Sequence, residues 1–379
     1  MKKISLFEPN ITNSEKKTVI KSLNTNQIST YGYFNNLLEI EIKKISGARY
    51  NLALSSGSAS LYVALKSLGI KSNEIVITQS YTFAATTNAI LLNNSIPLLV
   101  DISKNNLNID FEFLKEFFEK QTYKKNNSTY HKKTKKKITC ICFVFTLGII
   151  PDLKKINFFK KKYNLKIIFD AACALGTKYE NKNLTNFCDV AVYSLNGNKN
   201  FTSGAGGIFS SNKKRIYNYA RQYSNNGKSN NSYDYKMIGF NFRMSSFNAS
   251  LGLGQIKRYK NIIKQKNKIK SLYAKNLQPV KLYNTNFKWG NYLPWINFLL
   301  IKEKNRNIMI NLLKKNKIFI SKFWLPLHIQ SVKKNFILTK FQNTNYIFKR
   351  ILILPSSTFL KKKDIVRICK TIKKISNES

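Results

Sequence analysis

The sequence predicts an α/β fold with a mostly parallel central sheet and helices on both faces of that sheet. From about residue 50 onward, short apolar runs alternate with segments of helical periodicity, which is typical of parallel strands joined by crossover helices. A chain of 379 residues also exceeds the size at which a single core usually stops growing. We therefore expect a large domain over residues 1–250 and a smaller C-terminal α+β domain over residues 251–379.

The expected elements follow one another in order along the chain. The strands are predicted at residues 51–54, 74–78, 97–101, 137–145, 166–170 and 188–195. The helices between them are predicted at residues 59–68, 82–92, 111–120 and 152–163. The lysine-rich segment 123–137 lacks apolar periodicity and is expected to be a solvated loop or an extension of the crossover connection, with a functional basic clamp as the less favoured alternative. A long, lysine-rich amphipathic helix is expected to end near residue 275, followed by the short elements of the second domain.

The charge is strongly basic: 65 Lys and Arg against 18 Asp and Glu give a formal net charge of +47. Such a balance first suggests binding to nucleic acid or to an acidic membrane. The lysines are spread over the whole chain among many Asn and Ile, however, and they form no segregated basic face with interleaved aromatics. A compositional bias of the source genome explains this pattern, so we expect no nucleic-acid partner. A general attraction for anionic ligands such as nucleotides is compatible with it.

The cysteines and the N-terminal residues indicate in which cellular compartment the protein is expected. The five cysteines show no metal-ligand spacing and leave one over for disulfides, so we expect a reduced protein without a metal. The first residues carry two lysines but no apolar segment behind them. No stretch approaches the ~20 apolar residues of a membrane helix. We therefore expect a cytoplasmic protein that does not bind a membrane.

A turn of small residues opens the first predicted crossover helix, in the segment LSSGSASLYVAL at residues 54–65. Gly57 would let the backbone approach a ligand closely, and the amides of Ser58 and Ala59 would point at an anion held by the helix N-terminus. The same pattern also fits a simple helix N-cap. Both interpretations stay open on the sequence alone.

Asp170 and Lys199 are the two candidate catalytic residues. Asp170 ends an apolar strand in FDAACALG, where a carboxylate either caps the next helix or faces a ligand cation such as a protonated pyridine nitrogen. Lys199 lies in a Gly- and Asn-rich loop after a strand, 29 positions later, rather than on a solvated helix face. A phosphate cradle, then a carboxylate for the ring nitrogen, then a lysine is the order in which a pyridoxal-phosphate site is assembled.

These motifs resemble the sugar aminotransferases of the DegT/DnrJ/EryC1/StrS family. The resemblance covers nearly the whole chain, through EPNITNSE, ALSSGSASLYVAL, QSYTFAATTNAIL, VDISKNNLNID, IIFDAACALG, YSLNGNKNFTSGAGG, GFNFRMSSFNASLGLGQ, WLPLHIQ and ILPSS. It implies the type I pyridoxal-phosphate aminotransferase fold. The loop SLNGNK, with no glutamate before the final glycine pair, is most similar to the branch that aminates UDP-4-keto-6-deoxy-N-acetylglucosamine in bacillosamine and legionaminic acid biosynthesis.

The resemblance implies roles for the residues around the cofactor. Lys199 would carry pyridoxal 5'-phosphate as a Schiff base and, once freed, would move the proton between the cofactor and the donor or sugar carbon. Asp170 would pair with the pyridine nitrogen. Phe83 would stack on the ring, with a plain core aromatic as the alternative, and Ser194 would bind the phosphate together with the turn at residues 57–59.

Three further residues are assigned by the resemblance alone. Asn241 would reach the phosphate of the neighbouring subunit's cofactor, which implies a homodimer with shared active sites. Arg243 would lie near the substrate or the cofactor. His328 would lie in the substrate pocket, although a purely structural role for a histidine next to a proline-containing loop fits equally well.

The chain departs from the family pattern at three positions. Cys173 stands where the family usually has Gln, Glu or His beside the phenolic oxygen of the cofactor. Phe145 replaces the usual histidine, and Ala205 removes a carboxylate that is common in other branches. The first two departures point to an unusual acceptor sugar or to reduced activity.

The leading hypothesis is a two-stage exchange in which an amino acid, expected to be glutamate, donates its amine through the cofactor to a nucleotide-linked keto sugar. The alternative on the same fold is a sugar dehydratase, a group that has histidine in place of the lysine, so Lys199 argues against it. A third hypothesis belongs to a different functional class: the net charge alone would favour a basic regulatory or nucleic-acid-binding protein.

Overall fold

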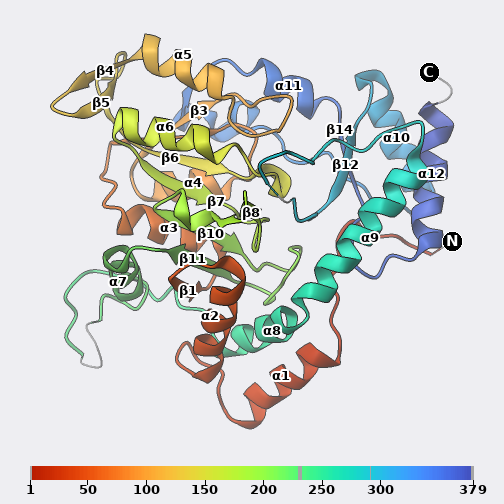
Figure 1. The fold of residues 1–379 in the computed structure, drawn as a ribbon, viewed down its shortest axis with the longest axis horizontal. Coiled ribbons are helices and arrows are strands. Elements are labelled where there is room, and N and C mark those ends of the chain that lie inside the picture. The colour runs from red at the N-terminus through yellow and green to blue at the C-terminus, as the bar shows by residue number, and fades with distance from the viewer. Residues whose placement is uncertain (1, 229–232, 291, 377–379) are drawn as a thin grey trace.

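The computed structural model describes residues 2–228, 233–290 and 292–376. Within these residues a ten-stranded sheet forms the centre of the molecule (Figure 1). Its main path runs through β1 (Tyr50–Leu54), β11 (Gly207–Ser211), β10 (Val190–Ser194), β7 (Lys166–Asp170), β6 (Lys137–Val144), β2 (Ile75–Gln79), β3 (Ile96–Val100) and β13 (Ile337–Leu338). From β10 to β13 every neighbouring pair is parallel, whereas β11 is antiparallel to both of its neighbours. The predicted α/β class with a mostly parallel sheet is confirmed.

Both faces of the sheet are buried, which explains why its strands read as continuous apolar runs. Successive side chains of a strand point to opposite faces, so Ile75 and Ile77 join one core while Val76 joins the other. The first core takes side chains from α2 (Tyr33–Ser46), α5 (Phe111–Gln121), α6 (Leu153–Tyr163) and α8 (Ser246–Lys257). The second takes them from α3 (Gly57–Ser67), α4 (Ala85–Leu92) and α7 (Lys214–Tyr223).

The expectation of a solvated loop at residues 123–137 is wrong. This segment forms a hairpin of β4 (Thr122–Lys125) and β5 (Ser128–His131), and β5 pairs with β6 to extend the sheet. Thr129 and His131 are buried while their neighbours are partly exposed, which is the alternation of an ordinary half-buried strand. The many lysines flanking the hairpin hid this short alternation in the sequence.

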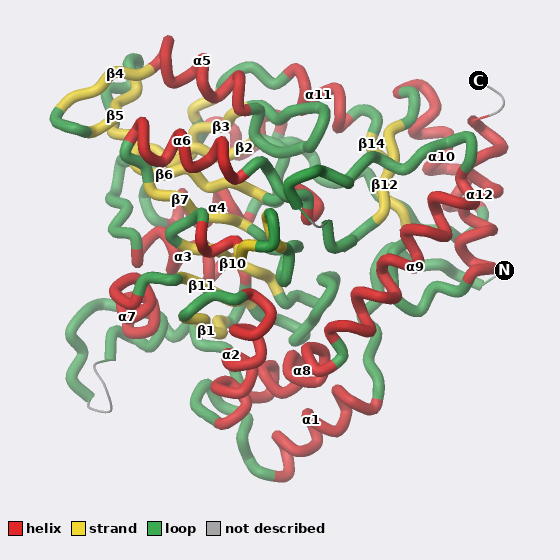
Figure 2. Tube along the Cα trace, in the orientation of Figure 1, coloured by secondary structure: helices red, strands yellow, loops and turns green. Residues whose placement is uncertain are grey.

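A third hydrophobic core lies away from the sheet, at the C-terminal side of the chain. It packs α9 (Tyr259–Leu277), α10 (Glu303–Lys315) and α12 (Lys362–Ser376) around the antiparallel pair β12 (Asn297–Leu300) and β14 (Ile351–Leu354). Figure 1 shows α9 crossing from α8 to α12, and Figure 2 shows loop segments gathered between the central sheet and the β12–β14 pair. The division of the chain near residue 250 stays a prediction.

The remaining elements are short or peripheral. They are α1 (Asn13–Asn24), which packs on α8, the small hairpin β8 (Lys178–Tyr179) and β9 (Lys182–Asn183), α11 (Gln342–Phe348), and the 3-10 turns Thr146–Gly148, Leu184–Asn186, Leu327–Ile329 and Ser331–Asn335. None of the helices that the structure describes is both long and apolar enough to cross a membrane.

Candidate active site

Asp170 is the last residue of β7 and lies in the middle of the parallel part of the sheet, at the carboxyl ends of the strands. Its side chain is almost fully buried, accepting a hydrogen bond of 2.7 Å from Thr86 Oγ1 and one of 3.3 Å from the amide of Ala172. Burial raises the pKa of Asp170 above its usual value, although these hydrogen bonds and the charge of Lys199 oppose the shift. A turn rather than a helix follows the residue, so Asp170 caps no helix.

Lys199 lies in the loop after β10 and is only partly exposed. Its Nζ donates to Cys173 Sγ at 3.1 Å and lies 4.2 Å from the ring centre of Trp295. The positive charge also acts electrostatically on Asp170. The structure therefore brings together the two residues that the sequence singled out, with the amine and the carboxylate in one pocket.

The N-terminus of α3 forms another wall of that pocket through its N-cap Ser56 and its first residues Gly57 and Ser58. Ser56 is the helix N-cap, since its Oγ accepts from Ala59 N at 3.0 Å. A Cβ on Gly57 would come within 3.2 Å of Ser194 Cβ, so the start of α3 and the end of β10 are closely apposed. The N-cap interpretation is thus confirmed, and the free end of the helix still faces the pocket, where it favours an anion.

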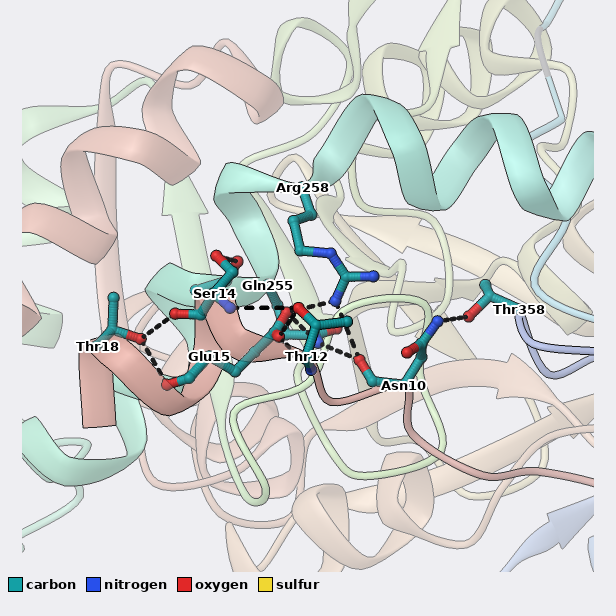
Figure 3. A network of polar contacts seen from close by, with 9 residues as sticks. Asn10, Thr12, Ser14, Glu15, Thr18, Gln255, Arg258 and Thr358 are labelled. Atoms are coloured by element: carbon teal, nitrogen blue, oxygen red, sulfur yellow. Dashed lines mark hydrogen bonds and ion pairs between the residues drawn. The ribbon is translucent and has the colours of Figure 1, made fainter. Parts of the chain in front are cut away.

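A buried network fixes the N-terminal segment that reaches this pocket (Figure 3). Glu15 accepts from Thr12 N at 2.7 Å, from Arg258 Nη1 at 2.7 Å and from Gln255 Nε2 at 2.8 Å. Burial raises the pKa of Glu15, but the hydrogen bonds from Thr12 and Arg258 outweigh it and leave the pKa below its usual value. Gln255 and Arg258 also donate to the carbonyl of Asn10, so the segment before α1 is tied to the end of α8.

This tie places two apolar residues in the pocket wall and completes an aromatic enclosure. The cavity measures about 540 Å³ and is lined by Leu6 and by the aromatic residues Phe7, Phe83, Phe145, Trp295, Phe323 and Trp324. Sequence reasoning missed Phe7 and the aromatics at 295, 323 and 324. The chain contains 49 aromatic residues, and nothing local distinguishes these from core residues. Thr86, which donates a hydrogen bond to Asp170, could not be recognised as a site residue from the sequence either.

The departures from the family pattern lie in the pocket as well. Cys173, Phe145 and Ala205 all line it, and burial raises the pKa of the Cys173 thiol. Phe145 packs against Phe169 with ring centres 5.1 Å apart, so it presents an apolar surface. Phe83 is 60% exposed at the mouth, which argues against the alternative of a plain core aromatic.

Besides Ala59, whose amide already donates to Ser56 Oγ, three residues suggested by the resemblance lie outside this pocket in the isolated chain. His328 is buried, with Nδ1 2.6 Å from Ser80 Oγ and Nε2 3.0 Å from Asn345 Oδ1, so protein groups already engage both ring nitrogens. Arg243 lies over the ring of Tyr31 at 5.6 Å. Asn241 is exposed on the surface.

A second lysine, Lys266 of α9, is buried behind the pocket. Its Nζ donates to the carbonyls of Trp295 and Ser356, each at 2.8 Å, rather than to a carboxylate. Burial lowers the pKa of Lys266 to about 7, because the charged form loses its hydration.

This burial predicts a specific pH dependence of stability. Between pH 7 and the usual lysine pKa of about 10.4, the unfolded chain keeps a proton on Lys266 that the folded chain has lost, so the free energy of unfolding rises with pH. We expect the native chain to gain on the order of 2 kcal/mol from pH 7 to pH 9 relative to Lys266→Met, measured by urea unfolding. Lys264→Met, an exposed position on the same helix, serves as the control and should follow the native chain. Equal pH dependence in the native chain and in Lys266→Met would contradict this assignment.

The pocket fits pyridoxal 5'-phosphate in its donor set. The start of α3 suits the phosphate, the buried Asp170 suits a protonated ring nitrogen, and Lys199 offers an amine beside both. An α/β fold with this pocket at the carboxyl ends of its parallel strands is typical of pyridoxal-phosphate-dependent aminotransferases.

The chain belongs to the DegT/DnrJ/EryC1/StrS aminotransferase family, which matches residues 9–373. It is therefore a sugar aminotransferase that uses pyridoxal phosphate, as members of this family do. GDP-perosamine synthase of Escherichia coli O157:H7 is 27% identical over 379 residues, with 98% of each chain covered. The UDP-4-amino-4,6-dideoxy-N-acetyl-beta-L-altrosamine transaminase of Campylobacter jejuni is 30% identical over 74% of this chain and 72% of its own.

Solved structures share the fold. Helicobacter pylori PseC, an aminotransferase involved in the biosynthesis of pseudoaminic acid, superposes with a TM-score of 0.88 at 21% identity, covering 100% of both chains. The DegT DnrJ EryC1 StrS aminotransferase of Brucella abortus gives a TM-score of 0.88 at 22% identity, covering 96% of this chain and 95% of its own. Both similarities support the same chain architecture from end to end.

Proposed function

We propose that the protein transfers an amine from glutamate to UDP-4-keto-6-deoxy-N-acetylglucosamine, in the biosynthesis of a cell-surface glycan or a nonulosonate. The observation that carries the proposal is the pocket that joins Lys199, Asp170 and the start of α3 to an aromatic wall. Aromatic faces suit the apolar side of a deoxysugar ring, while the basic chain attracts a charged nucleotide. The branch-like loop SLNGNK supports the choice of the UDP-linked sugar.

The polar residues of the pocket have separate roles in this exchange. The ring of the cofactor, when bound, supplies an electron sink for the deprotonated donor carbon. Asp170, shielded from water, holds a proton on the ring nitrogen by an ion pair. Lys199 would hold the cofactor covalently and, when free, would move the proton between the cofactor and the donor carbon in the first stage and between the cofactor and the sugar carbon in the second. Ser194 and the amides of Gly57 and Ser58 hold the phosphate.

Incubation with glutamate and a panel of UDP-, GDP- and dTDP-linked keto sugars tests the substrate. Formation of the 4-amino sugar together with 2-oxoglutarate, with the highest kcat/KM on the UDP-linked N-acetyl sugar, is the expected result. A GDP-linked sugar is the second candidate, because the whole-length relative from Escherichia coli carries the name GDP-perosamine synthase. A preference for the GDP-linked sugar would overturn the first candidate and leave the reaction class intact.

A dehydratase on the same fold would leave the sugar without an amine. Lys199 stands where that group has histidine, and the buried contacts of the lysine amine support a catalytic role for it. Retention of the glutamate nitrogen in the sugar product, followed with 15N-labelled glutamate and mass spectrometry, distinguishes the two reactions. Five free and buried cysteines support a cytoplasmic location, where thiols stay reduced.

We also propose that two subunits share each active site, with Asn241 reaching the phosphate in the neighbouring subunit. Asn241 lies outside the pocket of its own chain. Large apolar side chains beside it are exposed in the single chain: Tyr31 is 56% exposed, Ile238 88% and Phe240 48%. Exposed apolar patches of this kind mark protein interfaces, and a second copy of the chain would cover them.

Subunit mixing tests the shared site. An inactive Lys199→Ala chain and an impaired Asn241→Ala chain should recover activity when mixed, because one site of the heterodimer then draws both residues from unmutated positions. Loss of one hydrogen bond to a charged phosphate costs roughly 1.5–3 kcal/mol, so Asn241→Ala should bind the cofactor about tenfold to a hundredfold more weakly. Mixing is therefore done at limiting cofactor.

The matched control mixes Lys199→Ala with Asp170→Asn. Both residues line the same chain's pocket, so each site of that heterodimer keeps one lesion and no recovery is expected. Full activity in a monomer by light scattering, or no recovery with Asn241→Ala despite demonstrated exchange, would show that each subunit builds its own site.

A further inference from the structure

Trp295, which lies just before β12, contacts the lysine loop at two points. Its indole Nε1 donates to the carbonyl of Asn198 at 2.8 Å, and its ring centre lies 4.2 Å from Lys199 Nζ. The first contact fixes the backbone immediately before the lysine, and the second holds the end of its side chain. A residue almost a hundred positions further along the chain thus contacts both the backbone next to Lys199 and the end of the lysine side chain.

Trp295 itself is held rigidly. It is 1% exposed, and its ring is parallel to that of Phe7, with ring centres 5.6 Å apart and an interplanar angle of 3°. Its carbonyl accepts a hydrogen bond from the buried Lys266. Because Phe7 belongs to the segment anchored by Glu15 and Arg258, the indole is fixed from the N-terminal segment, from α9 and from the lysine loop together.

The charge of Lys199 has few other partners in the described part of the chain. No carboxylate there forms an ion pair with it, and its hydrogen-bond acceptor is the weakly accepting thiol of Cys173. A cation over the face of an indole is attracted by the ring quadrupole, most strongly where water is excluded. Apart from Cys173 and the nearby charge of Asp170, the face of Trp295 is therefore the main contact of the Lys199 side-chain nitrogen.

We propose that Trp295 is a positioning residue that holds the free Lys199 amine as an ammonium against its ring, beside Cys173, whenever the lysine is not bound to the cofactor. The proposal rests on the role proposed for Lys199. It gives the lysine a defined resting place at the wall of the pocket that also contains Asp170. The aromatic ring supplies this place without a further carboxylate in the pocket. Such a carboxylate would compete with Asp170 for the positive charge on the ring nitrogen of the cofactor.

Fluorinated tryptophan tests this without changing the shape of the pocket. Fluorine withdraws electrons from the ring face and weakens its attraction for a cation while leaving the indole N–H in place. The full-length protein, stripped of cofactor, is produced with ordinary, monofluorinated and trifluorinated tryptophan, and acylation of Lys199 is followed by mass spectrometry across pH. We expect the pH profile of labelling to move stepwise toward lower pH, with the rate at a fixed pH on the rising limb increasing roughly twofold to tenfold.

Trp295→Phe is the matched control, since Trp289 and Trp324 then still carry the fluorine. In this variant fluorination should leave the labelling profile of Lys199 unchanged, which assigns the effect to one ring. An unchanged profile on fluorination of the native chain overturns the proposal, and that measurement needs no substitution that could disturb folding. Borohydride reduction of the cofactor-loaded native enzyme, followed by peptide mapping, asks separately whether Lys199 carries the cofactor. A failure of that role is thus distinguishable from a failure of the Trp295 contact.

Discussion

Replacement of Lys199 by Ala is expected to abolish transamination while the chain still folds. Lys199 is only partly buried and lies in a loop, so the truncation removes contacts to Cys173 and Trp295 but no part of the sheet core. Loss of a positioned acid-base group alone costs roughly 10²–10⁴-fold in rate, and the covalent link to the cofactor is lost as well. Turnover with glutamate and circular dichroism are the two measurements.

The buried Lys266 offers a control for this experiment, because it lies behind the same pocket. Borohydride reduction should attach the cofactor to the peptide that contains Lys199 in the native enzyme and also in Lys266→Met. Wild-type turnover in Lys199→Ala, or a reduced adduct on another lysine, would show that the catalytic lysine has been assigned wrongly.

Asp170→Asn should lower the rate of the first half-reaction by orders of magnitude with the cofactor still bound. The amide oxygen can still accept from Thr86, so the local geometry is kept. A neutral partner leaves the ring nitrogen mostly unprotonated, and removing one member of a buried charge pair costs roughly 3–5 kcal/mol, or about two to four orders of magnitude in rate. Single-turnover kinetics at saturating glutamate measure the effect, and the absorbance of the bound cofactor checks occupancy.

Asp189 is a suitable control, because it is another buried aspartate on a neighbouring segment of the sheet but lies outside the pocket. It forms ion pairs with Lys160 and Lys213 and accepts from Ile167 N, all of them structural contacts. Asp189→Asn should lower the free energy of unfolding and leave turnover intact. An unchanged single-turnover rate in Asp170→Asn would remove the electron-sink role from this carboxylate.

Local sequence patterns were sufficient for the class of fold and for the two central residues. Strands buried on both faces are apolar at every position, and crossover helices show a 3.6-residue period, so β2, β7 and their neighbours were found within about two residues of their observed ends. Asp170 and Lys199 were found because one ends a strand and the other follows one, and the carboxyl ends of parallel strands meet at one edge. These patterns involve only residues that are close together in the chain, so they can be recognised from the sequence alone.

Tertiary structure alone decided which side chains surround the two central residues. Thr86 reaches Asp170 across 84 positions, and Trp295 reaches Asn198 across 97, with no local pattern that marks either contact. In a sequence, an aromatic residue that will be buried looks like any other apolar residue. Which residue its ring contacts depends on how distant segments of the chain pack together. For the same reason His328 could be placed near Ser80 only by the fold, since a ring nitrogen bonds whichever polar group packing brings within reach.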